Sequence, residues 1–149
     1  MSANILVDTN VLVYAYDRAA GVKQQQALDV LDELIQRSAG AITTQVLAEF
    51  FVTVTRKLAA PLSITDAYVR VENYLRAWTV YDLTGLIVLE AARGVRDYQL
   101  SFWDAQIWAA ARLNQIPVIF SEDFNVGATL DGVRFVNPFD SAFQIKDWV

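Results

Sequence analysis

The sequence of 149 residues contains no cysteine and no histidine. Without cysteine there are no disulfides, thiol nucleophiles, Cys-ligated zinc sites or iron–sulfur clusters. Without histidine, Ser–His–Asp catalysis, HExxH zinc sites and imidazole general bases are excluded as well. Any catalytic chemistry in this chain must therefore rest on carboxylates, hydroxyls, amides, tyrosines, lysines or arginines.

Signals for secretion and membrane insertion are also missing. The first ten residues, MSANILVDTN, have neither a basic region nor a long apolar stretch, so we expect no signal peptide. No run of about 18 apolar residues occurs, so we expect no membrane span. Together with the lack of cysteine, this favours a cytoplasmic protein. The net charge of −5 argues against a general polyanion binder, although a nucleic-acid enzyme can carry few and local basic residues.

The chain shows no linker, low-complexity segment or internal repeat, which predicts a single domain over residues 1–149. Short apolar runs alternate with segments of helical periodicity. Strands are expected at residues 5–7, 41–43, 80–81, 116–120 and 133–136, and helices at about 23–38, 44–58, from 63, from 84 and 101–114. This alternation predicts an α/β fold in which helices cover both faces of a parallel sheet. The ligand site of such a sheet lies beyond the carboxyl ends of its strands.

Acidic residues follow two of the expected strands. Asp8 comes directly after the first strand, and Glu122 and Asp123 come just after the fourth. Because neighbours on an extended chain point apart, we expect Asp123 to face the site and Glu122 to lie outside it. Thr9 and Asn10 follow Asp8, and both can hydrogen-bond to a carboxylate or a phosphate. The alternative, that these acids are turn or helix-cap residues, stays open at this point.

Two further acids belong to expected helices. Asp104 is the third residue of a helix that Ser101 caps, which is by itself a sufficient structural reason for an acid. The residues one turn further on, Ile107 and Trp108, are apolar, so this carboxylate needs a distant partner or a metal. Glu49 lies opposite the apolar stripe of its helix, which fits either a solvated face or the border of a cleft.

Carboxylates that converge without histidine repel one another unless a cation joins them. A set of oxygen ligands selects hard ions, so Mg²⁺ or Mn²⁺ is expected rather than zinc. Such an ion lowers the pKa of a bound water and so provides a nucleophile without cysteine or histidine. These residues therefore predict metal-dependent hydrolysis, and phosphodiester cleavage is its natural reaction class.

Four segments in order resemble the PIN domain family, and most closely the ribonuclease toxins of type II toxin–antitoxin modules, the VapC group. They are the opening run Ile5–Tyr14, the helix that bears Glu49, the segment Trp103–Ala111, and the strand followed by Ser121, Glu122 and Asp123. The tail Asp131–Phe139 also looks like a recurrent ending in one branch of these toxins. The resemblance covers about Ile5 to Phe139.

The resemblance implies a three-layer α/β/α fold and an endoribonuclease that hydrolyses RNA phosphodiester bonds with a water activated by Mg²⁺ or Mn²⁺. By motif match, the catalytic and metal-binding acids are Asp8, Glu49, Asp104 and Asp123. The supporting residues are Asn10, Thr9, Ser121 and Glu122. Residues 124–126 provide no further acid, which leaves a fifth ligand open. The implied partners are RNA, a cognate antitoxin whose segment occupies the acidic groove, and a second copy of the chain in a homodimer.

Other interpretations are weaker. A haloacid-dehalogenase-like phosphatase needs a second Asp two residues after the first, and Asn10 stands there. A PIN-like module that only binds proteins would be free to lose its acids, and all four are present. For phosphate contact, the best basic clusters are Arg56–Lys57 and Arg93/Arg96. The tryptophans are expected in the core or at an interface; they are Trp78, Trp103, Trp108 and Trp148.

Overall fold

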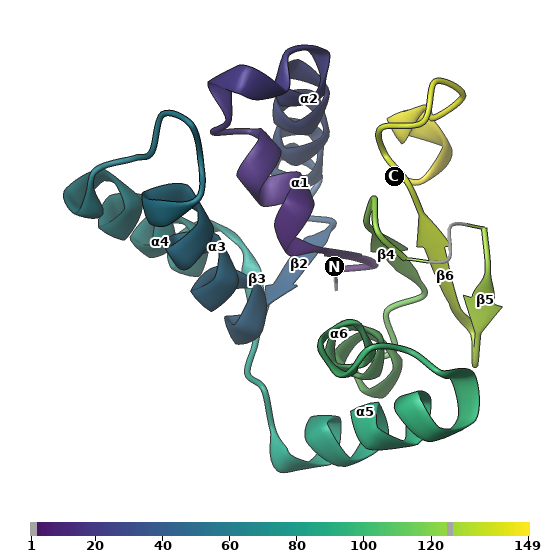
Figure 1. Ribbon diagram of the computed structural model, residues 1–149. Coiled ribbons are helices and arrows are strands. Elements are labelled where there is room, and N and C mark those ends of the chain that lie inside the picture. The colour runs from purple at the N-terminus through teal and green to yellow at the C-terminus, as the bar shows by residue number, and fades with distance from the viewer. Residues whose placement is uncertain (1–2, 125–126) are drawn as a thin grey trace.

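The computed structural model describes residues 3–124 and 127–149. A six-stranded sheet with the order β3-β2-β1-β4-β6-β5 runs through its middle (Figure 1). The strands are β1 (Ile5–Val7), β2 (Gly40–Thr43), β3 (Thr79–Tyr81), β4 (Val118–Phe120), β5 (Thr129–Leu130) and β6 (Val133–Val136). All neighbouring strands pair in parallel except β5, which runs antiparallel to β6. The expected parallel sheet is confirmed, with one antiparallel strand added at its edge.

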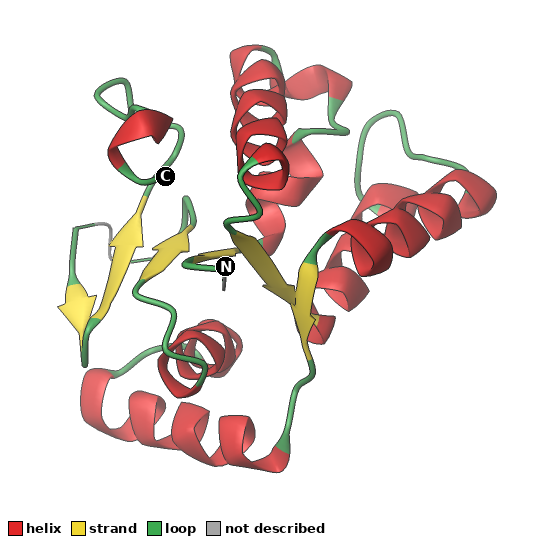
Figure 2. Ribbon diagram, turned by 180° about the vertical axis from the view of Figure 1, so that it is seen from behind, coloured by secondary structure: helices red, strands yellow, loops and turns green. Residues whose placement is uncertain are grey.

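Helices cover both sides of this sheet. They are α1 (Thr9–Tyr14), α2 (Val22–Gln36), α3 (Thr44–Arg56), α4 (Ile64–Ala77), α5 (Gly85–Tyr98) and α6 (Phe102–Leu113), with short 3-10 helices at Arg18–Ala20 and Ile145–Asp147. The pair α5 and α6 lies on one side, and α1 and α2 lie on the other, with α3 and α4 toward the β3 edge (Figures 1 and 2). The α/β/α sandwich implied by the sequence resemblance is therefore observed.

The helices begin where capping residues stand in the sequence. The Ser63 hydroxyl accepts a hydrogen bond from the backbone N–H of Asp66, and Ser101 caps α6 in the same way through the N–H of Asp104. Each bond satisfies an amide that has no partner inside the helix. Asp104 is thereby fixed in the first turn of α6, close to the sheet.

Aromatic and branched side chains fill the space between the layers. Trp108, Phe50 and Phe120 are fully buried, and the sheet strands β1 and β4 contribute further core residues. The helices α5 and α6 approach closely at Gly94, where an added Cβ would come within 2.8 Å of the Trp108 ring. This packing holds the start of α6 in a fixed position on the sheet.

The strand order creates a crevice at one rim of the sheet. The chain passes from β1 outward through β2 to β3, and then returns to the other side of β1 to form β4. The chain leaves the carboxyl end of β1 through α1 and α2 on one face, whereas the connection that leads into β4 runs through α5 and α6 on the other face (Figure 1). The carboxyl ends of β1 and β4 therefore meet where the strand order reverses, which is where open α/β sheets bind ligands. Asp8 follows β1, and Ser121 follows β4. In the part of the chain that the structure describes, no helix is long and apolar enough to cross a bilayer.

Candidate active site

Asp8 directly follows β1 at this rim and is only 6% exposed. It caps α1, and its Oδ1 accepts a 2.7 Å hydrogen bond from the backbone N–H of Thr9. Its Oδ2 accepts another 2.7 Å bond from the hydroxyl of Ser121. The two segments meet because β1 and β4 pair in register, with Val7 opposite Phe120. Asp8 and Ser121, the residues that directly follow β1 and β4, therefore lie side by side at the same rim.

The amide of Asn10 connects the segment after β1 with the segment after β4 at this rim. Its Nδ2 lies 3.4 Å from Oδ2 of Asp8 and 3.3 Å from Oγ of Ser121. The same nitrogen donates to Oδ2 of Asp123 at 3.1 Å. The backbone N–H of Asp123 also donates to Ser121. Asp8 and Asp123, which are far apart in sequence, are therefore held around one amide group.

Glu49 approaches the crevice from α3. Its Oε2 accepts a 2.8 Å bond from the hydroxyl of Thr9, and its Oε1 accepts a 3.1 Å bond from the amide of Gln45. Gln45 in turn accepts from the buried Gln106 and donates to the carbonyl of Trp103, both on α6. This chain of polar contacts orients the Glu49 carboxylate and ties α3 to α6. The interpretation that this face of α3 borders the cleft is the one that the structure supports.

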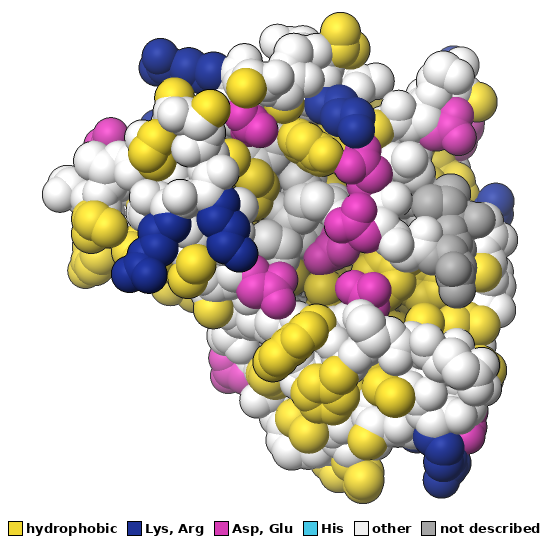
Figure 3. Space-filling model, viewed as in Figure 1, with side chains coloured by type: hydrophobic (Ala, Val, Ile, Leu, Met, Phe, Trp, Pro, Cys, Tyr) yellow, Lys and Arg dark blue, Asp and Glu magenta, His cyan; other side chains and the backbone are white. Residues whose placement is uncertain are grey.

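The electrostatics indicate that the four acids share one region. The pKa of Asp8 is raised to about 6, mainly by burial and to a lesser extent by the charges of Asp104 and Glu49, against the hydrogen bonds from Ser121 and Thr9 that lower it. Burial also raises the pKa of Asp104, as do the charges of Asp123 and Glu49. Acidic side chains accordingly form a line across the middle of one face of the molecule (Figure 3).

Glu122 points to a different set of partners. It forms an ion pair with Lys23 of α2 and accepts a 2.7 Å bond from the hydroxyl of Tyr14. Burial raises the pKa of Glu122, but the bonds from Lys23 and Tyr14 outweigh that effect and the pKa is lowered. The Lys23 ammonium also lies 5.1 Å from the centre of the Tyr14 ring. Asp123 is thus the acid that faces the other carboxylates, and Glu122 anchors its segment to α1 and α2.

The four acids have a donor chemistry that suits a hard divalent ion. Their ligand atoms are all oxygens, and no ion pair joins Asp8, Glu49, Asp104 or Asp123 to a cation within residues 3–124 and 127–149. Mg²⁺ and Mn²⁺ prefer such oxygen sets. Among the described residues, no three acids stand close enough to form a ready metal-binding group, so binding an ion would draw these side chains together.

The sequence identified most of this arrangement and missed some supporting contacts. The structure brings Thr9, Asn10 and Ser121 into hydrogen bonds with the acids, in the supporting positions expected of them. It adds the contact that Lys23 and Tyr14 make with Glu122 over 99 and 108 residues of sequence. No local pattern signals such a contact. Residues 125 and 126, which the sequence analysis named because they provide no fifth acid, lie outside the described residues.

The two basic clusters named from the sequence differ in the structure. Arg93 pairs with Glu90 and Asp131, and Arg96 pairs with Asp97, so this cluster is neutralised. Arg56 and Lys57 are exposed at the end of α3. Dark-blue basic side chains stand over α3 beside the acidic line (Figure 3).

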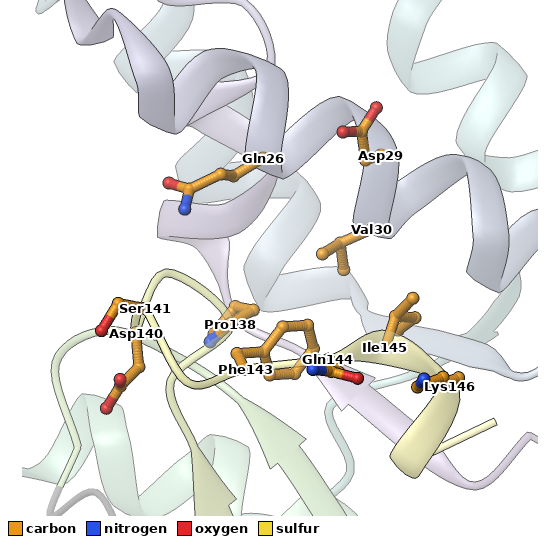
Figure 4. Close-up of a pocket in the computed structure, with 10 residues that line it drawn as sticks. All are labelled: Gln26, Asp29, Val30, Pro138, Asp140, Ser141, Phe143, Gln144, Ile145 and Lys146. Carbon is orange, nitrogen blue, oxygen red and sulfur yellow. The ribbon is translucent and has the colours of Figure 1, made fainter.

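The tryptophans are not all core residues. Trp78 and Trp108 are buried, as expected, whereas Trp103 is 61% exposed next to Asp104. It lies in an edge-to-face contact with Phe102, with ring centres 5.7 Å apart. A 450 Å³ cavity between α2 and the C-terminal segment is separate from this region, since none of the four acids lines it (Figure 4).

Comparison with sequence families agrees with the fold. Residues 5–129 match the family described as PIN domain. No curated protein matches the chain in sequence.

Several solved structures share the fold at low sequence identity. A chain of a toxin–antitoxin complex from Klebsiella pneumoniae has a TM-score of 0.68 and 21% identity, with 93% of this chain and 99% of that chain covered. VapC20 from Mycobacterium tuberculosis, a toxin that cleaves the sarcin–ricin loop, gives 0.62 and 19%, covering 85% and 97%. DNA-bound VapBC from Salmonella typhimurium gives 0.65 and 16%, covering 93% and 99%.

Proposed function

Because the chain belongs to the PIN domain family, we propose that it is a single-domain, Mg²⁺- or Mn²⁺-dependent endoribonuclease and the toxin of a toxin–antitoxin pair. One observation carries the proposal. Four acids from β1, α3, α6 and the segment after β4 converge at the carboxyl rim of the sheet, and no cation from the described residues neutralises them. The fold shared with VapC toxins, one of which cleaves the sarcin–ricin loop, supports RNA as the substrate class.

The chain's own residues prepare this rim for hydrolysis. A bound divalent ion would lower the pKa of water and so supply the nucleophile that the missing cysteine and histidine cannot provide. Asn10 holds Asp8 and Asp123 together, and Thr9 and Gln45 fix the orientation of Glu49. The Ser121 hydroxyl donates to the Asp8 carboxylate, which favours its ionised form against the effect of burial. These contacts orient the individual carboxylates, and binding an ion would then draw the acids together.

The phosphatase alternative is not supported by the geometry. A haloacid-dehalogenase-like enzyme needs an acid two residues after Asp8 to transfer a proton. Asn10 occupies that position, and its amide donates to Asp8 and Asp123 instead. An amide cannot act as a general acid or base in this role.

The test is cleavage of RNA by the purified protein in Mg²⁺, in Mn²⁺ and in chelator. We expect cleavage only with the metals, and loss of cleavage in Asp104→Asn. Asp66→Asn is a matched control, because Asp66 is also the third residue of a helix capped by serine, and it is exposed. Equal cleavage in chelator and in metal, or full activity of Asp104→Asn, would refute the proposal.

A cognate antitoxin is the proposed protein partner. The four acids offer a place for a basic side chain of such a partner, which would neutralise them when no metal or RNA is bound. The similar chains from Klebsiella pneumoniae and Salmonella typhimurium come from toxin–antitoxin structures, which supports this partner class. A small upstream reading frame whose product co-purifies with the chain is the expected observation.

We also propose that the protein is a homodimer. Exposed apolar side chains lie on α5 and at the start of α6, among them Leu86 at 72%, Leu89 at 68% and Trp103 at 61%. A yellow patch is visible there, directly below the acidic line (Figure 3). Contiguous apolar patches of this kind mark protein interfaces. Sedimentation should show a dimer that Leu89→Glu dissociates, and a monomer at all concentrations would refute this part of the proposal.

A further inference from the structure

A groove on the outer face of α3 begins at the acidic cluster and ends at a lysine. Its volume is about 420 Å³, and its lining residues are Thr9, Ala48, Glu49, Val52, Thr53 and Lys57. Thr9 and Glu49, which share a hydrogen bond, form the end next to the active site. Lys57 follows Glu49 by eight residues, or roughly 12 Å along a helix axis. The groove is large enough for part of a nucleotide chain and is continuous with the proposed site of cleavage.

Among the described residues, Lys57 is one of six cations that form no ion pair with an acid; the others are Arg18, Arg56, Arg70, Arg134 and Lys146. Ion pairs with acids engage Lys23, Arg37, Arg76, Arg93, Arg96 and Arg112. The guanidinium groups of Arg70 and Arg134 lie over the rings of Tyr16 and Trp148. Lys57 is exposed, and its ammonium is therefore available to an anionic group that enters the groove.

A purely structural role explains only part of this arrangement. Lys57 is the C-cap residue of α3, where a positive charge interacts favourably with the helix dipole. That role requires a cation near the helix end but no groove that links it to Glu49. Binding of RNA at this site requires both the cation and the groove. The protein has a net charge of −5 and its proposed site is acidic, so an RNA strand needs local positive charge to approach it.

We propose that this groove is the path of the single-stranded RNA backbone that flanks the cleavage point, and that Lys57 contacts a flanking phosphate. The inference rests on the proposed function, because it assigns the substrate of that same site. The separation between Glu49 and Lys57 places the lysine beyond the scissile phosphate. Val52 and Ala48 provide an apolar floor for a sugar or base, and the Thr53 hydroxyl adds a polar contact.

The test is the salt dependence of RNA binding, measured with a short labelled single-stranded RNA in the Asp8→Asn background. A single phosphate contact contributes about 0.7 to the slope of log affinity against log salt. Lys57→Gln should reduce the slope by that amount and weaken binding roughly fivefold at 0.1 M salt. Arg76→Gln is the control for net charge. Arg76 lies in the last turn of α4, just before the amino end of β3. The four acids lie at the other rim, at the carboxyl ends of the strands.

The slope separates a phosphate contact from a structural role, since loss of a helix-end charge changes stability but not the number of released counterions. If Lys57→Gln and Arg76→Gln give the same slope and affinity, the groove is not the RNA path and suits a protein segment instead. In the cleavage-competent chain we expect Lys57→Gln to raise KM about fivefold and to leave kcat unchanged. Cleavage with an unchanged KM would refute the groove alone, whereas absence of cleavage in the unmodified chain would refute the proposed function.

Discussion

Asp8 carries a negative charge in a buried place, and replacing it with asparagine should stabilise the protein while removing its activity. The folded environment raises the pKa of Asp8 from the ordinary value of 3.8 to about 6, mainly through burial. A carboxyl group with a raised pKa favours the folded state below pH 3.8, and this advantage is lost as pH rises to about 6. At neutral pH the ionised Asp8 is therefore destabilising in the absence of metal.

The size of the effect follows from the shift. A difference of about two pKa units corresponds to roughly 3 kcal/mol. The hydrogen bonds from Thr9 and Ser121 are already included, because they lower the pKa of Asp8. Asparagine resembles the protonated acid, and any cost of fitting its amide is the same at every pH. The difference in unfolding free energy between Asp8→Asn and the unmodified protein should thus rise by about 3 kcal/mol between pH 4 and pH 8.

Urea unfolding of both proteins in chelator, across this pH range, measures that difference. In thermal unfolding the same change corresponds to roughly 6–12 °C for a domain of this size. Added Mg²⁺ should then stabilise the unmodified protein and leave Asp8→Asn unaffected, since an ion that binds only the folded state shifts the unfolding equilibrium. If the two stability curves run parallel from pH 4 to pH 8, the reasoning about Asp8 is wrong.

Three further substitutions test other parts of the structure. Gly94→Ala should destabilise the protein by about 1–3 kcal/mol in urea unfolding, because the new Cβ would meet the buried Trp108 ring, and a more stable variant would contradict this packing. Thr9→Val removes the hydroxyl that orients Glu49, so metal affinity measured by titration calorimetry should fall about 10-fold or more, and an unchanged affinity would count against that role. Glu122→Gln breaks the partly exposed ion pair to α2 and should cost at most about 1 kcal/mol of stability while lowering kcat, so a large loss of stability with normal kcat would overturn the anchoring role.

The helix α1 shows why part of the fold escaped the sequence analysis. Residues 11–14 are apolar and mostly β-branched or aromatic, a composition that favours a strand. The structure forms a helix over Thr9–Tyr14 instead, since Asp8 caps its first amide and Val11 and Leu12 are buried against the core. Tertiary packing and one cap thus outweigh local preference over a single short segment.

The small strand β5 was missed although the sequence contains its signal. Asp131 and Gly132 have positive φ angles of 47° and 82°, as a type I′ hairpin turn requires. The Asp-Gly pair is the strongest short-range hairpin signal, but the strand before it has only two residues, and a run that short carries no periodicity. The fourth strand is also shorter than expected, because Pro117 has no backbone N–H to donate to the sheet.

Three of the four proposed acids, Asp8, Asp104 and Asp123, could be placed from the sequence because general rules of topology and helix capping locate them. The acids that follow strands lie at the carboxyl rim of a parallel sheet, and a serine cap fixes Asp104 in the first turn of its helix. Glu49 was ambiguous, since the periodicity of α3 gives the direction of its side chain but not what lies opposite. The packing of α1 against α3 brings the Thr9 hydroxyl to the Glu49 carboxylate. This tertiary contact, which the periodicity does not show, places Glu49 beside the other acids and not on a solvated face.

For the basic residues too, the sequence does not show which acids distant in the chain lie beside them, and this affects the proposed function. As sequence, Arg56–Lys57 and Arg93/Arg96 are equivalent pairs of cations on helices. In the structure Arg93 is drawn to Asp131 of the β5–β6 turn, 38 residues away, and its charge is cancelled there. In a protein of net charge −5, a cation serves a polyanionic substrate only if no acid of the chain reaches it first. The path of RNA to an acidic site is therefore determined by the cations that tertiary packing leaves unpaired, and Lys57 is the one that lines a groove leading to the four acids.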